Sequence, residues 1–344
     1  MKASTKDGRL AVTLGDLSGI GPEVVLSSLA QGARDGQLLV YGNERVLRRV
    51  SDASGIPLPT GMACLPGETR AFGDLPDVPV VLFDFPFPEQ DDVRPGSVQP
   101  CCGRMAHRFI CEAVKDVLAG QADALVTAPI HKEALRLAGV SYPGHTELLS
   151  SLTGGAVPCM AFFSPRLVVS LVTIHEALAD VPHLITPGKL ERVIRLTRDA
   201  CTARVAGREP RLGVLALNPH AGEHGLFGDE EERVLQPVIR RLQAEGFALS
   251  GPLVPDTAFA WLFSGGDAPY DGYIAMYHDQ GLIPFKAAAF DNGVNVTLGL
   301  PIVRTSPDHG TAFDRAWKGT ASPSSMTAAL RLARRLALRQ EEST

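Results

Sequence analysis

The chain has 344 residues, of which 45% are hydrophobic and 21% charged, a globular composition at a length that favours two domains. Its formal net charge of -5 excludes the basic footprint of a nucleic-acid-binding protein and the cationic patches that bind anionic membranes. Residues 1–9 are polar and no apolar run approaches the roughly 20 residues of a membrane span, so we expect no signal peptide and a cytoplasmic protein.

Short β-branched runs alternate with helical patterns along the chain. The expected strands are residues 10–14, 37–41, 78–83, 124–127, 160–164, 167–172, 211–217 and 272–276. The expected helices are residues 22–30, 43–53, 103–119, 131–137, 186–206, 229–245 and the amphipathic surface helix 325–339. Segments 55–67 and 84–100 carry prolines without periodicity and are expected to be surface connections. The alternation predicts an α/β fold with a largely parallel sheet.

The cysteines predict reduced thiols rather than a disulfide framework. Most of them lie in apolar or helical contexts, and the adjacent pair Cys101 and Cys102 cannot easily form a bridge. The histidine segments described next contain no cysteine, so a thiolate metal site is not expected. The cysteines stand at positions 64, 101, 102, 111, 159 and 201.

Histidines stand in polar, glycine-marked segments that follow apolar runs, which is where α/β enzymes place their chemistry. The segments are Pro143-Gly-His-Thr-Glu147, Val172-Thr-Ile-His-Glu176, Asn218-Pro-His-Ala-Gly-Glu223 and Met276-Tyr-His-Asp-Gln-Gly281. Imidazoles delivered in this way could converge on one metal ion. No two of them have the close spacing of a local metal motif, so scattered loop histidines remain the alternative.

Two further segments have the residues to hold an anion. The turn Leu14–Glu23 carries glycines at positions 15, 19 and 21 and opens a helix, where free N–H groups favour negative charge. It departs from the GxGxxG fingerprint, and a tight turn without a ligand is the alternative. His131 and Lys132 follow a strand and could meet a carboxylate or phosphate, or could be solvated residues of a first helical turn.

The densest polar segment runs from residue 278 to residue 311. Lys286 and Arg304 are the cations that an anionic substrate needs, and arginine suits a bidentate contact with phosphate or carboxylate. Residues 293–301 between them read as a strand. Asp256 and Asp279 are carboxylates that could orient a ligating imidazole or accept a proton, with solvated loop acids as the alternative.

Six motifs can be read along the chain: Gly15-Asp-x-x-Gly-Ile-Gly-Pro-Glu23, Pro143-Gly-His-Thr-Glu147, Asn218-Pro-His-Ala-Gly-Glu223, Tyr277-His-Asp-Gln-Gly281, Gly293-Val-Asn-Val-Thr-Leu-Gly-Leu-Pro301 and Arg304-Thr-Ser-x-Asp-His-Gly-Thr-Ala312. This combination resembles the 4-hydroxythreonine-4-phosphate dehydrogenase family of pyridoxal 5′-phosphate (vitamin B6) biosynthesis. The motifs occur in order through nearly the whole chain. Leu17-Ser18 departs from the family, which usually has Pro-Ala there.

The resemblance implies an isocitrate/isopropylmalate dehydrogenase-like fold of two α/β/α domains with an active-site cleft between them. The first domain would comprise residues 1–137 and 292–344, with the glycine turn and the adenosine-binding loop. The second would comprise residues 138–291, with the metal ligands and the interface of a homodimer that shares its active site. Neither nucleic acid nor membrane is an expected partner.

The resemblance also implies roles for individual residues. The metal ligands would be His175, His220 and His278. Substrate binding would involve His145, Thr146, Lys286, Asn295 and Arg304, and catalysis Asp256, Asp279 and Lys286. Cofactor binding would involve Gly15, Gly19, Gly21, His309, Gly310 and Thr311. His131 and His224 receive no role.

The implied reaction is an NAD- or NADP-dependent and metal-dependent oxidation of 4-phosphohydroxy-L-threonine. Its 3-oxo acid product would decarboxylate to 3-amino-2-oxopropyl phosphate. Nitrogen ligands suit zinc, cobalt or nickel better than magnesium, so zinc is the expected metal, with cobalt or magnesium as alternatives. No clear acid or arginine marks the ribose 2′ position, so NAD and NADP stay open.

Other functions stay open at this point. Phe290-Asp-Asn-Gly293 and Phe313-Asp-Arg-Ala-Trp317 look closer to a sister branch that oxidises D-erythronate or D-threonate 4-phosphate in sugar-acid catabolism. A third branch, the dihydrodiol dehydrogenases, lacks the Gly-His-Thr-Glu motif. Two further classes are a phosphate acyltransferase of the same fold, which needs no three-histidine metal, and a metal-dependent sensor without turnover.

Overall fold

The computed structural model describes residues 8–31, 36–142, 144–205 and 207–342. Residues 1–7, used above to exclude a signal peptide, and Pro143 of the first histidine motif lie outside these ranges. Within them, no helix combines the length and the apolar character that a membrane crossing requires. The chain forms two compact units, Met1–Pro158 with Leu300–Thr344, and Cys159–Gly299.

The first unit is built on a parallel sheet with the strand order β3-β4-β2-β1-β5-β12. The central strands β1, β2 and β5 are buried along their whole length, as expected for parallel strands covered on both faces. The strands are β1 (Leu10–Thr13), β2 (Leu38–Gly42), β3 (Ala63–Pro66), β4 (Val80–Asp84), β5 (Ala124–Thr127) and β12 (Val303–Pro307).

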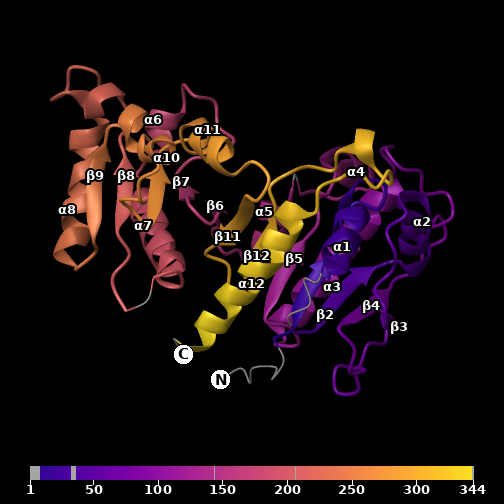
Figure 1. The fold of residues 1–344 in the computed structure, drawn as a ribbon. Coiled ribbons are helices and arrows are strands. Elements are labelled where there is room, and N and C mark those ends of the chain that lie inside the picture. Colours follow the sequence, from indigo (N-terminus) through magenta and orange to yellow (C-terminus); the bar gives the residue numbers. More distant parts are fainter. Residues whose placement is uncertain (1–7, 32–35, 143, 206, 343–344) are drawn as a thin grey trace. The chain divides into compact units, whose positions relative to one another are not determined.

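Helix α3, which connects β4 to β5, and the C-terminal helix α12 pack on this sheet. Helix α3 contacts β1, β2 and β5, whereas α12 contacts β12, β5 and β1 and also touches α1; Figure 1 shows α12 in yellow beside β12 and β5. Proline at the first turn starts α1 and α3, and the Asn43 side chain caps α2 by accepting the Val46 N–H at 2.9 Å. The helical segments are α1 (Gly21–Ala30), α2 (Glu44–Ser54), α3 (Pro100–Leu118), α4 (Lys132–Leu137), α5 (His145–Leu152), α12 (Ser324–Glu342) and the 3-10 turn η3 (Phe313–Arg315).

The second unit has a mixed sheet with the order β11-β6-β7-β10-β8-β9. Strand β6 is antiparallel to both neighbours, whereas β7, β10, β8 and β9 are parallel. Its core packs Phe162, Leu171, Tyr273 and Phe285. The strands are β6 (Cys159–Phe163), β7 (Val168–Leu171), β8 (Leu212–Leu215), β9 (Leu249–Leu253), β10 (Gly272–Ala275) and β11 (Val294–Leu298).

The helical segments of the second unit are mostly short, apart from the long helix α7. They are α6 (Val181–Leu184), α7 (Pro187–Thr202), α8 (Gln236–Ala244), α9 (Pro255–Ala258), α10 (Trp261–Ser264), α11 (His278–Ala289), the 3-10 turn η1 (Pro219–Gly222) and the π-helical turn η2 (Glu231–Leu235). Thr186 caps α7, since its hydroxyl accepts the Lys189 N–H at 3.3 Å.

The structure confirms the α/β class and every expected strand and helix, with ends shifted by a few residues. It also contains elements that the sequence did not predict. Strand β3 lies inside the expected connection 55–67, β9 and β12 were not expected, and α5 and α11 begin at histidines that were assigned to loops. Within the helix expected at 229–245, residues Glu231–Leu235 form a π-helical turn that leads directly into α8.

The unit boundaries also differ from the expected ones at 137/138 and 291/292. Contacts place them at 158/159 and 299/300. The reason at the first boundary is that α5 packs on α3 of the first unit. At the second boundary, β11 pairs with β6 along its whole length, from Val294 opposite Phe163 to Leu298 opposite Cys159, and so belongs to the second unit.

Candidate active site

The glycine turn lies where a ligand binds in an open parallel sheet. The chain leaves β1 towards β2 on one side, and β5 occupies the other side, so the strand order reverses next to the end of β1. Ligands of such sheets bind outside the carboxyl ends of the strands at this point. A Cβ on Gly15 would meet the Pro129 carbonyl oxygen at 2.2 Å, and one on Gly21 the Leu14 carbonyl oxygen at 2.3 Å. Both positions therefore require glycine for close backbone approach.

The predicted cofactor residues from the two ends of the chain meet in the first unit. The Ile20 N–H donates to the Thr311 carbonyl at 3.0 Å, and a Cβ on Gly19 would lie 3.0 Å from atoms of Thr311. Gly310, one residue earlier, has open space around its Cβ position, and His309 Nδ1 lies 3.1 Å from the Gly310 carbonyl oxygen. The glycine turn and the 309–311 loop thus form one backbone surface at the start of α1.

Two side chains next to this surface were not assigned a role from the sequence. Asp16 is fully buried, and its Oδ1 accepts from the Ser18 N–H at 3.0 Å and the Ser18 hydroxyl at 2.7 Å. Burial raises the pKa of this carboxyl. His131 stacks on Phe313, with ring centroids 4.6 Å apart, and its Nδ1 accepts the Ala134 N–H at the start of α4. In the sequence, the position of Asp16 directly after Gly15 of the glycine turn was the feature that could have indicated a role for this residue.

Arg304 is a buried cation of the first unit, with Thr127 and His145 beside it. Arg304 on β12 is 3% exposed, and its Nη2 and Nε donate to the Thr127 hydroxyl at 2.6 and 3.2 Å. Burial lowers the pKa of the Arg304 guanidinium to about 9, so the group is charged at neutral pH. Thr127 is the last residue of β5, a strand that the sequence predicts without assigning a role to this residue.

His145 opens α5 beside this cation, with Thr146 as the next residue of the helix. Burial, and secondarily the charge of Arg304, holds the pKa of His145 well below its ordinary value, so the imidazole is neutral. Its Nε2 is buried and accepts or donates no hydrogen bond among the residues that the structure describes. A neutral imidazole beside a buried guanidinium suits a ligand that presents both an anionic oxygen and a hydrogen-bonding group.

In the second unit, the three candidate metal ligands and one candidate catalytic acid follow consecutive parallel strands. His175 follows β7, His278 follows β10, His220 follows β8 and Asp256 follows β9, and these strands are neighbours in that order. Because the strands are parallel, the four residues are delivered at one edge of the sheet. The rings of His175 and His278 are adjacent, with centroids 5.7 Å apart and planes tilted by 39°.

Local contacts set the position of His278 at the start of α11. Its Nδ1 lies 2.7 Å from Asp279 Oδ1, an arrangement that orients the ring and leaves Nε2 for a ligand. Gln280 accepts the Met276 N–H at 2.7 Å and donates to the Ala216 carbonyl at 2.6 Å, which ties the end of β10 to the end of β8. The loops that carry His278 and His220 are therefore connected directly.

The remaining predicted residues of this unit lie on three elements. Lys286 is on α11, two turns after His278, with Nζ 5.8 Å from the centroid of the Phe290 ring. Asn295 is on β11 opposite Phe162 of β6, and Asp256 is exposed in the first turn of α9.

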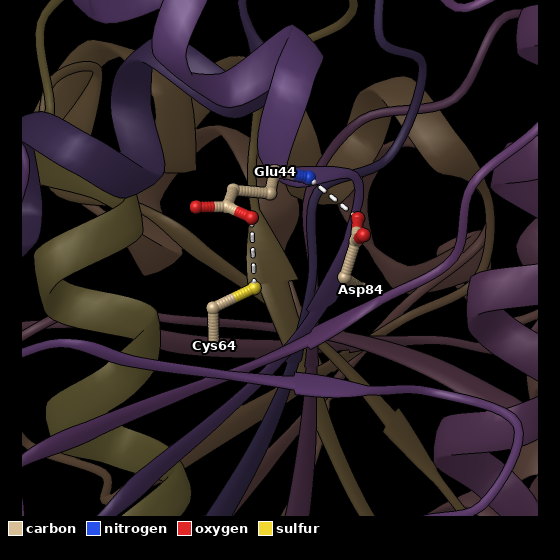
Figure 2. Close-up of side chains that lie close together, drawn as sticks. All are labelled: Glu44, Cys64 and Asp84. Carbon is tan, nitrogen blue, oxygen red and sulfur yellow. Dashed lines mark hydrogen bonds between the residues drawn. The ribbon is translucent and has the colours of Figure 1, made fainter.

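A different group has the tightest set of potential metal ligands. Glu44, Cys64 and Asp84 place three ligand atoms within 4.8 Å of one another, as Figure 2 shows, and across the described part of the chain the histidines form no such group. Asp84 accepts the Glu44 N–H at 2.7 Å, and the Cys64 thiol donates to Glu44 at 3.2 Å. Burial, then Glu44, raises the pKa of the Cys64 thiol to about 12. Glu44 is the first residue of α2, so these contacts also hold the start of that helix.

Comparisons with known proteins show the family of this chain. The family model described as "Pyridoxal phosphate biosynthetic protein PdxA" matches residues 35–333. A 4-hydroxythreonine-4-phosphate dehydrogenase from Trichlorobacter lovleyi is 43% identical over 97% of this chain and 99% of the relative. A D-threonate 4-phosphate dehydrogenase from Pectobacterium atrosepticum is 40% identical over 95% of this chain and 99% of the relative.

A solved structure carries the same fold. The crystal structure of 4-hydroxythreonine-4-phosphate dehydrogenase from Klebsiella pneumoniae is similar with a TM-score of 0.82 and 39% identity, covering 97% of this chain and 99% of that one. The residues matched by the family model, 35–333, include the four histidine segments and part of each unit. The chain therefore belongs to the pyridoxal phosphate biosynthetic protein PdxA family.

Proposed function

We propose that this protein is a metal- and NAD(P)-dependent dehydrogenase that oxidises 4-phosphohydroxy-L-threonine in pyridoxal 5′-phosphate biosynthesis. The 3-oxo acid that forms would decarboxylate to 3-amino-2-oxopropyl phosphate. The observation that carries the proposal is the delivery of His175, His278 and His220 by three adjacent parallel strands. Curated relatives of this family are named as dehydrogenases, which supports an oxidoreductase.

The donor set fits a divalent transition metal. His175, His220 and His278 offer imidazole nitrogens, which suit zinc or cobalt better than magnesium. The 2.7 Å contact from His278 Nδ1 to Asp279 is the usual second partner of a ligating histidine. When bound, the ion would supply Lewis acidity to the hydroxyl of the substrate and to the carbonyl that replaces it.

The charged residues of the second unit would handle protons and developing charge. Asp256 is exposed at the same sheet edge as the histidines and is assigned as the acceptor of the hydroxyl proton. Asp279 orients His278. The Lys286 ammonium would oppose the negative charge that appears on the substrate oxygen when CO2 leaves, and the Asn295 amide would hydrogen-bond to the substrate.

The first unit would bind the substrate's anionic groups and the cofactor. Arg304 carries the charge, Thr127 fixes the plane of its guanidinium, and neutral His145 and Thr146 add hydrogen-bonding groups. The joined surface of the glycine turn and the 309–311 loop is assigned to the nucleotide, because it combines a helix start with closely packed backbone. The cofactor's role is to accept the hydride.

We also propose a homodimer. Large apolar side chains are exposed on the second unit in segments that follow the ligand histidines. Leu178 is 68% exposed, Leu226 71%, Ile283 68% and Phe290 75%. Burial of these side chains in a dimer would remove their apolar surface from water, which favours association. Sedimentation of the purified protein tests the dimer, and a monomer at micromolar concentration would contradict it.

The experiment that tests the function is NADH or NADPH formation by zinc-reloaded protein with three substrates in parallel. Turnover of 4-phosphohydroxythreonine supports the proposal. Turnover only of D-erythronate or D-threonate 4-phosphate would favour the second candidate, which the 40% identical D-threonate 4-phosphate dehydrogenase supports. Thermal stabilisation by substrate without turnover would indicate a sensor, and the absence of bound metal would favour an acyltransferase.

A further inference from the structure

The loop that carries His220 has a backbone conformation that is unfavourable for residues other than glycine. His220 has φ 52° and Ala221 φ 53°, followed by Glu223 at 42° and His224 at 57°. Residues with a Cβ rarely adopt this left-handed region, because Cβ crowds the neighbouring carbonyl oxygen. A run of such residues persists only where surrounding contacts determine the conformation.

Glu231 supplies those contacts from the π-helical turn η2. Its Oε1 accepts the Leu217 N–H and the Asn218 N–H, both at 2.8 Å, and its Oε2 accepts from the Asn218 side-chain amide at 3.0 Å. The side chain is 1% exposed. A Cβ on Gly222 would lie 2.9 Å from Glu231 Oε2, so the carboxylate lies against the far end of the same loop. One buried group therefore contacts both sides of His220 along the chain.

The turn around Glu231 supports this arrangement. Glu230 Oε2 accepts a second hydrogen bond from the Asn218 amide, at 2.7 Å. A Cβ on Gly228 would meet Asn218 Nδ2 at 2.4 Å, so only glycine allows the chain to pass this close. The π-helical turn starts at Glu231, and such turns recur at functional sites. Backbone irregularities on both sides of the contact thus bring the carboxylate and the loop together.

We propose that Glu231 is a positioning residue that holds His220 in the orientation needed to bind the metal. The inference rests on the proposed function, in which His220 is a ligand. Glu231 acts through the loop backbone and Asn218. A glutamate side chain suits this task because its two oxygens can accept several hydrogen bonds, and here they accept three from residues 217 and 218.

The test measures Co²⁺ binding, by visible absorption, to full-length protein stripped of metal, together with hydrogen–deuterium exchange of the metal-free protein. Glu231→Ala should weaken Co²⁺ binding by about 10- to 100-fold, the usual effect of losing an outer partner. It should also speed exchange in residues 217–224 while β8 stays protected. Glu231→Gln keeps one acceptor oxygen but turns an NH2 group towards Asn218, so its effects should be smaller and of the same sign. Glu232→Ala, an exposed neighbour in the same turn, is the matched control.

The two readouts separate this inference from the proposed function. If the wild-type protein and His220→Ala bind Co²⁺ equally, or neither binds it, the ligand assignment fails, and with it the inference. If His220→Ala loses the metal while Glu231→Ala keeps wild-type affinity, absorption spectrum and loop exchange, the inference alone is overturned. Should Glu231→Ala not fold, Glu231→Gln decides: wild-type values of affinity and exchange overturn the inference, and weaker binding with faster loop exchange supports it.

Discussion

The N–H of Ile20 donates a hydrogen bond to the carbonyl of Thr311, 291 positions later in the chain, at 3.0 Å. The start of α1 and the loop after β12 are therefore in direct backbone contact. A side chain added at this junction must displace either the helix start or the loop.

Gly19→Ala tests this junction. The new Cβ would sit 3.0 Å from Thr311 Cβ and its carbonyl oxygen, so the loop must shift. Overpacking of this kind costs about 1–3 kcal/mol, which corresponds to a rise of about 5- to 150-fold in KM for NAD(P) if the loop binds the nucleotide. Gly310→Ala is the control, because its Cβ position has no neighbour within 4 Å. Steady-state kinetics with equal cofactor KM in both variants would contradict the assignment.

Arg304 and Thr127 should act together on the phosphorylated substrate. Arg304→Ala removes the buried cation and should mainly raise the substrate KM. Thr127→Val keeps the shape of the side chain but removes the hydroxyl that accepts from Nε and Nη2. Leaving a buried donor unsatisfied costs about 1–3 kcal/mol. The double variant should therefore lose less than the sum of the single losses, and strict additivity of the measured kcat/KM changes would argue against coupling.

His145 should make stability depend on pH. The folded protein holds the pKa of His145 well below its ordinary value of 6.5, so the unfolded chain takes up the proton first as the pH falls. Stability should therefore be unaffected by this group above about pH 6.5 and should decrease below it, by up to about 1.4 kcal/mol per pH unit, until the lowered pKa is passed. His145→Gln should flatten the urea-unfolding free energy between pH 6.5 and 5, and an unchanged slope would show that His145 is not the titrating group.

Metal removal should affect the second unit. Zinc present at 100 times its Kd would stabilise the folded protein by about 2.7 kcal/mol, so chelation should lower Tm measurably. His278→Ala should abolish the Tm shift on zinc addition. Cys64→Ser should leave that shift intact, since the group formed by Glu44, Cys64 and Asp84 is assigned to the start of α2. A zinc response that follows Cys64 instead of His278 would move the metal to that group.

The sequence predicted the strands and the histidine segments because buried parallel strands are continuous apolar runs with polar residues at their ends. It did not predict α11, since Gly281 and Pro284 interrupt its helical pattern. Glu231 was also missed. It stands in the acidic run Asp229-Glu-Glu-Glu232, which reads as a solvated face, and only the fold of residues 217–222 against it shows that one of these acids is buried.

The discontinuous first unit has a consequence for how the protein is made. All of Cys159–Gly299 is synthesised before β12, so the sheet of the second unit can form while the first still lacks its last strand. During that interval β5 has an unpaired edge, and such edges promote aggregation. Arg304 and Thr311 are synthesised only with this final segment. A nascent chain stalled before residue 300 would therefore contain every candidate metal ligand but would lack the buried guanidinium and half of the backbone surface proposed to bind the nucleotide.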